Sequence, residues 1–269
     1  MGTAVFFHAH PDDEAITTGG TMAKLAAEGH RVVLVTATGG ELGEVPDGLL
    51  APDETLAQRR AAELALACEA LGVERLVFLG YHDSGMDGDP ANDDPACFWR
   101  ADVDEAAGRL AAVLEEEGAG VLTAYDAHGN YGHPDHIQVH RVGLRAGELA
   151  GTARVFMATT NRDHLLALTA VADELGLPMD EEQQEFIKEL GVVAGEITTA
   201  VDVSDYLADK RRAMEAHASQ IHDTSFFLSM PPEAFAAVWG TEWFIRVGAN
   251  GDAPWEDSLF AGSGTGAGG

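Results

Sequence analysis

Short apolar runs alternate with helix-like segments through the first 160 residues of the chain. The apolar runs have the length and residue types of buried strands, and they cover residues 3–7, 31–38, 75–79, 120–125 and 153–158. Helical patterns lie between them at residues 54–71, 103–117 and 135–149, and Gly72 and Gly118 follow the first two as stop signals. This alternation predicts an α/β fold, with a Rossmann-like, doubly wound, mostly parallel sheet covered by helices on both faces.

The pattern changes after residue 160. We expect an exposed acidic helix or lid at residues 180–189, a strand at 197–203, a helix at 204–219 capped by Ser204, and a last strand at 243–247. The chain is therefore divided into three predicted parts. They are a catalytic core at residues 1–160, a smaller C-terminal cap at 161–260 that completes the substrate cleft, and a Gly-rich disordered tail at 261–269.

Composition narrows the class of protein. A chain of 269 residues with 46% hydrophobic residues can bury one sizeable core. Its net charge of -29 argues against binding to nucleic acid or to an anionic membrane surface. No apolar stretch reaches the roughly 18 residues of a membrane-spanning helix, and no signal-like segment opens the chain, so we expect a cytoplasmic protein. The oligomeric state stays open.

The tripeptide His-Pro-Asp occurs twice, at residues 10–12 and 133–135, and both copies follow a predicted strand. Proline favours the first position of a helix and keeps the residue before it extended, so each histidine is expected where a strand has just ended. In an open α/β sheet, sites form beyond the carboxyl ends of strands where the strand order reverses. The two loops can therefore converge on one crevice. The alternative is that both tripeptides are surface turns whose side chains are solvated or cap a helix. That explanation suits a single His-Pro-Asp tripeptide better than two.

Further metal-binding side chains follow each copy. Asp13 lies three residues after His10, and His136 can add a third ligand from the second loop. Two nitrogen donors and one carboxylate, with a position left for water, are typical of a catalytic zinc site. The sequence therefore predicts a metal hydrolase.

The segments HAHPDDE at residues 8–14 and GNYGHPDH at residues 129–136 resemble the LmbE-like or PIG-L family of zinc-dependent N-acetylglucosaminyl deacetylases. The resemblance extends from about Val5 to Val142 and resumes around residues 216–221. Within the family, the chain is most similar to the mycothiol enzymes, which include a glucosaminyl-inositol deacetylase and an S-conjugate amidase.

The resemblance implies that His10, Asp13 and His136 hold Zn²⁺, for which Fe²⁺ is a possible substitute, and that Asp12 is the general base. It implies further that Tyr131 and His133 stabilise the oxyanion or protonate the leaving amine, and that Asp135 orients His133. 

Other positions are implied to bind the substrate or to support the site. By the same resemblance, Arg60 contacts the sugar-inositol part of a small amino-sugar substrate and Asp83 binds sugar hydroxyls. Glu14 is expected to cap or to support the site by hydrogen bonds, and His217 to line the cleft.

Two differences from the branches of the family leave the identity of the substrate open. The Lys that S-conjugate amidases carry soon after the first motif is missing at residues 15–19, whereas residues 239–244 look more like the amidase branch. The preferred function is deacetylation of an N-acetylglucosaminyl-inositol-like substrate. The alternatives are an S-conjugate amidase, an amidase of secondary metabolism acting on a glucosamine-bearing adduct, and a non-catalytic sugar-binding module. A nucleotide-dependent oxidoreductase is disfavoured, because a Gly-rich fingerprint does not follow the first strand.

Overall fold

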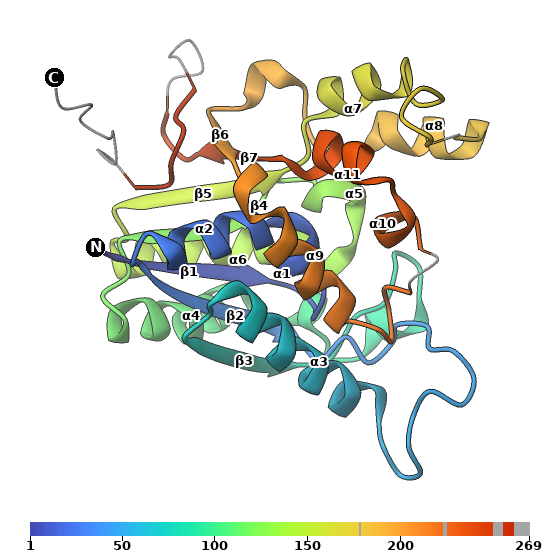
Figure 1. The fold of residues 1–269 in the computed structure, drawn as a ribbon. Coiled ribbons are helices and arrows are strands. Elements are labelled where there is room, and N and C mark those ends of the chain that lie inside the picture. The colour runs from blue at the N-terminus through green and yellow to red at the C-terminus, as the bar shows by residue number, and fades with distance from the viewer. Residues whose placement is uncertain (178, 223–224, 250–254, 261–269) are drawn as a thin grey trace, which may run out of the picture.

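The computed structural model describes residues 1–177, 179–222, 225–249 and 255–260. Its centre is a seven-stranded sheet in the order β3-β2-β1-β4-β5-β7-β6 (Figure 1). The strands are β1 (Thr3–His8), β2 (Arg31–Thr38), β3 (Arg75–Tyr81), β4 (Val121–Tyr125), β5 (Arg154–Thr159), β6 (Thr199–Asp202) and β7 (Thr241–Arg246). Strand β7 runs antiparallel to β5 and β6, whereas β1 to β5 pair in parallel.

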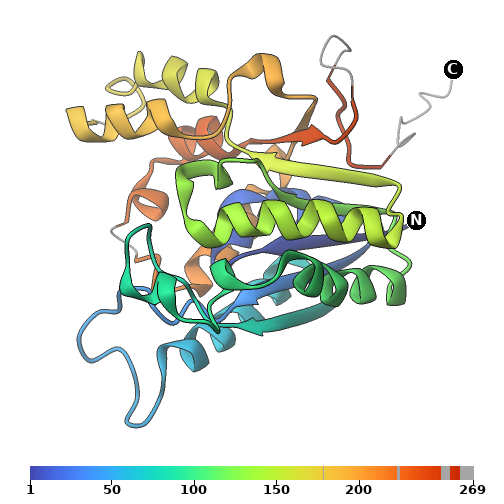
Figure 2. The same cartoon turned by 180° about the vertical axis from the view of Figure 1, so that it is seen from behind.

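Helices cover both faces of the sheet, which confirms the predicted doubly wound α/β fold. Helices α4 and α6 pack together on one face, and α2, α3 and α9 on the other (Figures 1 and 2). The helices are α1 (Asp13–Thr17), α2 (Gly19–Ala27), α3 (Leu56–Leu71), α4 (Val103–Glu116), α5 (Gly129–Gly132), α6 (Pro134–Ala150), α7 (Arg162–Thr169), α8 (Glu181–Glu189), α9 (Leu207–Ala216), α10 (Phe226–Ser229) and α11 (Pro232–Trp239). Short 3-10 turns lie at Pro90–Asp93, Phe98–Arg100, Ala194–Glu196 and Ser204–Tyr206.

The strand order reverses between β1 and β4. These strands are direct neighbours, with Val5 opposite Leu122, and the chain moves outward from them to β2 and β3 on one side and to β5 on the other. Both His-Pro-Asp segments follow these two strands, at the place where an open α/β sheet forms its crevice.

The helix ends show how local sequence sets the boundaries. Helix α3 starts in a capping box between Thr55 and Gln58, and it ends at Gly72 with a φ of 71°. The predicted helix at residues 204–219 is wrong in its extent and its cap. Ser204 begins a 3-10 turn, and its backbone N–H donates to the Asp202 carboxylate at 2.9 Å, so α9 starts later, at Leu207.

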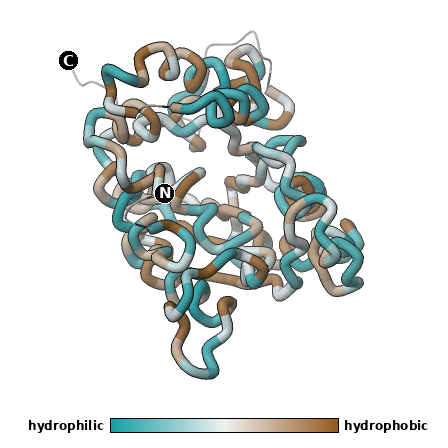
Figure 3. The backbone as a smooth tube through the Cα atoms, turned by 90° about the vertical axis from the view of Figure 1, so that its right-hand side faces the viewer, coloured by the Kyte–Doolittle hydropathy of each residue, from teal (hydrophilic) through white to brown (hydrophobic). Residues whose placement is uncertain are grey.

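The part after residue 160 adds two strands and a group of helices. Strands β6 and β7 join the main sheet, and α7, α8, α10 and α11 gather beyond its β5–β7 side (Figure 1). Hydrophobic and hydrophilic positions alternate along the helices of this upper part (Figure 3). The predicted acidic helix is present as α8, whereas the sequence analysis did not identify α7 or α11.

Two sequence predictions lie outside what the fold can decide. The division at residue 160 stays a prediction, because the sheet continues across it. Residues 261–269 lie outside the described residues. In the described part of the chain, no helix combines the length and the apolar character needed to cross a bilayer.

Candidate metal centre

Two histidines and one aspartate converge where β1 and β4 end. His10 follows β1, Asp13 opens α1, and His136 lies in the first turn of α6. The Nδ1 atom of His10 lies 3.5 Å from Asp13 Oδ2, and the Nε2 atom of His136 lies 3.3 Å from Asp13 Oδ1. All three residues are buried, and one possible ligand atom from each lies within 4.8 Å of the others. The sequence prediction thus named three residues that the structure brings together.

These separations suit a metal ion. Ligands about 2.0 to 2.1 Å from a tetrahedral zinc lie roughly 3.4 Å from one another. Nitrogen and carboxylate donors at that spacing, in a group of three among the residues that the structure describes, fit zinc or ferrous iron with an open position.

A second possible group shares His10 and uses Asp83 and His133 instead. The His10 ring has one nitrogen for each group, because Nδ1 faces Asp13 whereas Nε2 lies 3.6 Å from Asp83 and 3.2 Å from Asp135. A metal-bound histidine usually donates its other ring N–H to a carboxylate. Contact of Nε2 with Asp135 therefore favours Nδ1 as the ligand atom, and with it the group that contains Asp13.

Charge within the cluster supports an ionised Asp13. Burial alone raises the pKa of Asp13, but the nearby His136 and His10 outweigh it and hold that pKa well below its ordinary value. Burial likewise lowers the pKa of His10, whereas hydrogen bonds with Asp13, Asp135 and Asp83 raise it well above the ordinary value. The ionised Asp13 thus places a negative charge where a cation would be bound.

Asp12, the predicted base, occupies a strained backbone position. Its φ of 100° is rare for a residue other than glycine, and such strain persists only where neighbouring contacts fix it. Two of these contacts are a hydrogen bond from the Asp12 N–H to Glu14 Oε2 at 3.0 Å and an ion pair of 3.3 Å between Arg60 Nη2 and Asp12 Oδ2. Burial raises the pKa of Asp12 to about 6, against the opposing effect of Arg60. 

Arg60 is nearly buried beneath this loop. Its guanidinium donates to the carbonyl oxygen of Gly40 at 2.6 Å and to that of Pro11, in addition to pairing with Asp12. Gly40 has a φ of 62°, and a Cβ there would lie 2.3 Å from Arg60 Nη1, so glycine is required beside the guanidinium. These contacts give Arg60 a positioning role, and its predicted contact with the sugar stays a prediction.

The prediction that the Asp135 carboxylate orients the His133 ring is wrong. The Asp135 carboxylate accepts from the Ser84 backbone N–H at 3.0 Å and from the Ser84 hydroxyl, and it contacts His10. It is instead the Asp135 backbone N–H that donates to His133 Nδ1, at 3.1 Å, because His133 is the N-cap of α6. Burial, with added repulsion from His10 and His136, lowers the pKa of His133 to about 4.

Tyr131 and Asp83 lie on different sides of the cluster. The Tyr131 hydroxyl lies 3.4 Å from His136 Nε2, and burial raises the pKa of Tyr131. Asp83 accepts from the backbone N–H of Gly85 at 2.9 Å and of Leu42 at 3.2 Å, which leaves little of its carboxylate free. Its predicted binding of sugar hydroxyls stays a prediction.

Glu14 and His217 form a contact that the sequence analysis did not pair. His217 Nε2 lies 2.6 Å from Glu14 Oε1, and both side chains are almost wholly buried. The predicted place of His217 on the cleft wall is therefore wrong, whereas the predicted supporting role of Glu14 agrees with its hydrogen bond to Asp12.

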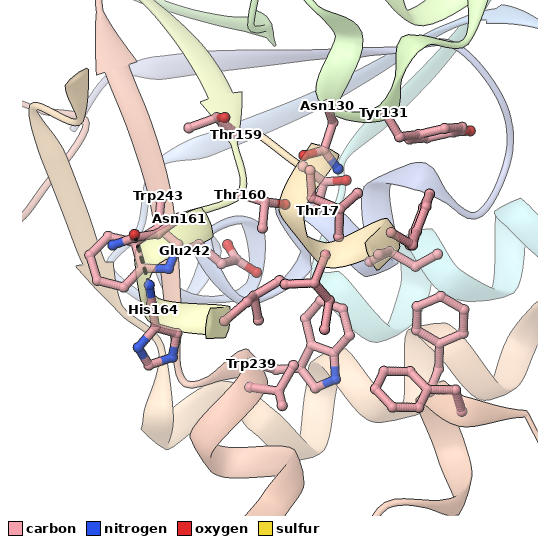
Figure 4. A pocket seen from close by; sticks show the side chains of 18 of the residues that line it. Thr17, Asn130, Tyr131, Thr159, Thr160, Asn161, His164, Trp239, Glu242 and Trp243 are labelled. Carbon is pink, nitrogen blue, oxygen red and sulfur yellow. Dashed lines mark hydrogen bonds between the residues drawn. The ribbon is translucent and has the colours of Figure 1, made fainter. Parts of the chain in front are cut away.

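A cavity of about 510 Å³ opens beside the cluster. Asp12, Asp13, Tyr131 and His136 line one end, and α7, α8, α10 and α11 supply most of the other. In Figure 4, Trp239 lies across this cavity from Asn130 and Tyr131. The sequence analysis predicted that residues 161–260 complete the cleft and identified the helix that is α8, but it did not identify α7 or α11, although Asn161 before α7 and Pro232 at the start of α11 are local helix-start signals.

Comparisons with known proteins agree on one family. Residues 5–147 match the PIG-L family, described as GlcNAc-PI de-N-acetylase. The chain is 42% identical over 284 residues to a 1D-myo-inositol 2-acetamido-2-deoxy-alpha-D-glucopyranoside deacetylase of Thermomonospora curvata, covering 96% of each chain.

Solved structures with the same fold differ in activity. N,N'-diacetylchitobiose deacetylase from Pyrococcus horikoshii has a TM-score of 0.55 at 20% identity, covering 91% of this chain and 83% of that one. The 4-carboxy-2-hydroxymuconate hydratase GalB from Pseudomonas putida has a TM-score of 0.59 at 19% identity, covering 93% and 98%. At this identity the likeness shows the fold alone, so the reaction must be argued from the site.

Proposed function

The chain belongs to the PIG-L family, and from that premise we propose that it is a metal-dependent enzyme that hydrolyses the N-acyl amide of a glucosamine-type sugar. The observation that carries this proposal is the convergence of His10, Asp13 and His136 next to the strained, partly buried Asp12 at one end of a cavity. Metal ligands and a separate carboxylate base are the two parts that hydrolysis of an amide requires.

The ligand residues have one task and Asp12 another. His10, Asp13 and His136 would hold Zn²⁺ or Fe²⁺, which when bound supplies Lewis acidity for amide cleavage. Asp12 takes the proton of the attacking water. With a pKa of about 6, its carboxylate is ionised at neutral pH yet more basic than an ordinary aspartate. Arg60 and Glu14 fix the direction of that carboxylate through their contacts with the loop.

His133 and Tyr131 act on the oxyanion that develops at the amide carbonyl. Because His133 Nδ1 accepts a hydrogen bond from Asp135 N–H, the proton of the neutral ring lies on Nε2, and that atom is a donor. The lowered pKa of His133 keeps the ring neutral, which suits hydrogen-bond donation to an oxyanion more than storage of a proton. The Tyr131 hydroxyl, next to His136, is the second donor.

For the substrate we propose an N-acylated glucosaminyl-inositol, the class named for the relative from Thermomonospora curvata. A second candidate is the S-conjugate amidase reaction, because Trp239, Glu242 and Trp243 of the amidase-like segment line the cavity. The glucosaminyl-inositol and the S-conjugate are both small amino-sugar substrates, and both would present an amide to the same side chains.

The test is an assay of zinc-reconstituted protein that measures the free amine released. The substrates are N-acetylglucosaminyl-inositol, a mycothiol S-conjugate and N-acetylglucosamine. Highest kcat/KM on the first supports the deacetylase assignment, and highest kcat/KM on the second supports the amidase. Release of amine from none of them, by protein that holds its metal, would contradict the proposed function.

A further inference from the structure

The far part of the cavity is an apolar chamber, by which we mean the walls supplied by α7, α8, α10 and α11. They include Leu168 of α7, Ile187 of α8, Phe227 of α10, and Val238 and Trp239 of α11. The whole cavity, at about 510 Å³, has the size of a site for a complete small molecule, roughly 300 to 1,000 Å³. An acetyl group bound at the metal centre would leave nearly all of this chamber empty.

Several polar groups that border the chamber are already paired within the protein, whereas the buried Nε1 of Trp239 has no hydrogen-bond partner among the described residues. Both carboxylate oxygens of Glu242 accept from backbone N–H groups, those of Gly20 at 2.8 Å and Thr21 at 2.7 Å, and Glu242 also pairs with the buried Lys210 at 2.6 Å. His164 Nε2 contacts the Ala237 carbonyl oxygen at 2.9 Å. 

Two more border groups are used in the same way. Asn161 Oδ1 accepts from the backbone N–H of His164 at 3.1 Å, and the Thr159 hydroxyl donates to Asp126 at 2.6 Å. A sugar seated here would find few free partners for its hydroxyl groups, and a hydroxyl that is buried without a partner weakens binding. The chamber is therefore suited to an apolar group and unsuited to the sugar.

The metal centre has a polar side that the chamber does not share. His10, Asp83 and His133 surround the same cluster, yet none of them lines the cavity. An amide whose carbonyl lies at His10, Asp13 and His136 therefore meets polar side chains on one side and the apolar chamber on the other. The apolar walls of the chamber match an acyl chain better than they match the polar amino sugar.

From this division, and resting on the proposed function, we propose that the chamber binds the acyl group of the substrate. It takes an apolar acyl chain of medium length, longer than acetyl, on the glucosamine nitrogen. Hydrolysis breaks the bond between that nitrogen and the carbonyl carbon, the water oxygen goes to the acyl group as a carboxylate, and the sugar leaves as an amine.

Each methylene moved from water into the chamber should strengthen binding about fourfold, the factor equivalent to about 0.8 kcal/mol. If this gain is expressed in the transition state, kcat/KM should rise with acyl length until the chamber is full. The experiment compares N-acetyl-, N-butanoyl-, N-hexanoyl- and N-octanoylglucosamine on the zinc-loaded protein. We expect kcat/KM for the octanoyl substrate to exceed that for the acetyl substrate by about 100-fold or more.

A matched pair of variants on α7 links the effect to the chamber. Leu168→Trp places a bulky side chain in the chamber, whereas Leu166→Trp makes the same change at a partly buried position of α7 that does not line the cavity. The ratio of octanoyl to acetyl kcat/KM should fall about 10-fold or more in the first variant and should stay as in the parent in the second. Val238→Phe, on α11, gives an independent obstruction if Leu168→Trp does not fold.

Binding to Asp12→Asn protein without metal separates this inference from the proposed function. Calorimetry should show N-octanoylglucosamine binding at least about 10-fold more tightly than N-acetylglucosamine, with the difference lost in the Leu168→Trp background. If no substrate is hydrolysed but this binding difference is found, the proposed function fails and the chamber assignment stands. Cleavage of the acetyl substrate with a flat or falling dependence on chain length would overturn the inference and leave the function intact. Equal binding of both sugars would also overturn it.

Discussion

Glu14 and His217 lie 2.6 Å apart across the interior, although 203 residues separate them in the sequence. Glu14 follows the first His-Pro-Asp segment, and His217 follows α9. The second oxygen of Glu14 accepts from the N–H of Asp12, the residue with the strained φ of 100°. The contact thus connects the C-terminal part of the chain to the backbone of Asp12, the proposed general base.

Replacing His217 should lower stability in a pH-dependent way. Burial acts to lower the pKa of His217, but Glu14 raises it above its ordinary value, so the protonated ring is more stable in the folded protein. That contribution is complete below the unfolded pKa of about 6.5 and is lost as the pH rises through the folded pKa. We expect His217→Ala to cost about 3 kcal/mol of unfolding free energy near pH 6 and less near pH 9.

Denaturant unfolding of the metal-free protein measures this loss. The exposed His222 offers a matched control, and His222→Ala should change the unfolding free energy by less than about 0.5 kcal/mol. A loss in His217→Ala that is equal at both pH values would refute the protonated pair.

Asp12→Asn should separate catalysis from metal binding. The amide keeps the size of the side chain but cannot take a proton, so kcat should fall by a factor of roughly 10² to 10⁴. The metal content should stay as in the parent, because Asp12 is outside the ligand group. Metal analysis and steady-state kinetics on the same preparation decide the matter, and normal turnover would move the base to another residue.

The pH dependence of kcat/KM should reflect the pKa of Asp12 and the effect of Arg60 on that pKa. Only the ionised carboxylate acts as a base, so kcat/KM should rise as the pH increases through about 6. The positive charge of Arg60 lowers the pKa of Asp12, and its removal in Arg60→Met should shift the acidic limb of the profile to higher pH. Arg59→Met, on the adjacent and more exposed arginine, is the control and should leave the limb in place. An unshifted limb in Arg60→Met would instead favour the direct sugar contact that the sequence suggests.

Gly129 should be indispensable to the second loop. Its φ is 63°, and a Cβ there would lie 2.6 Å from His136 Cβ and 2.7 Å from the Ile137 backbone nitrogen. Gly151 has nearly the same φ, 62°, but nothing lies within 4 Å of its Cβ position. We expect Gly151→Ala to cost about 1 kcal/mol and Gly129→Ala roughly 3 kcal/mol, with weaker metal binding in the latter alone. Equal thermal shifts would show that only backbone conformation matters at both sites.

The sequence predicted the sheet and the metal ligands because both have local signatures. Short apolar runs mark β1 to β5, and proline after histidine marks the two loops that follow β1 and β4. The sequence analysis did not predict the strand order, and it is the pairing of β1 with β4 in the structure that brings His10 and His136 together.

Long-range contacts were beyond the sequence. The pairing of Glu14 with His217, the burial of Lys210 against Glu242, and the positive φ of Asp12 depend on how distant segments pack. The chamber was missed for the same reason, since four short helices form it jointly. The error at Asp135 arose differently, because the capping geometry of α6 turns its carboxylate toward Ser84 and gives its backbone N–H to His133.

The most direct test of the metal centre is a zinc titration of three proteins by equilibrium dialysis: the parent, His136→Ala and His133→Ala. The two candidate ligand groups share His10 and differ in these two histidines. We predict about one tightly bound ion per chain in the parent and in His133→Ala, and loss of most of that binding in His136→Ala. Full binding by His136→Ala together with loss in His133→Ala would contradict the account and assign the metal to His10, Asp83 and His133.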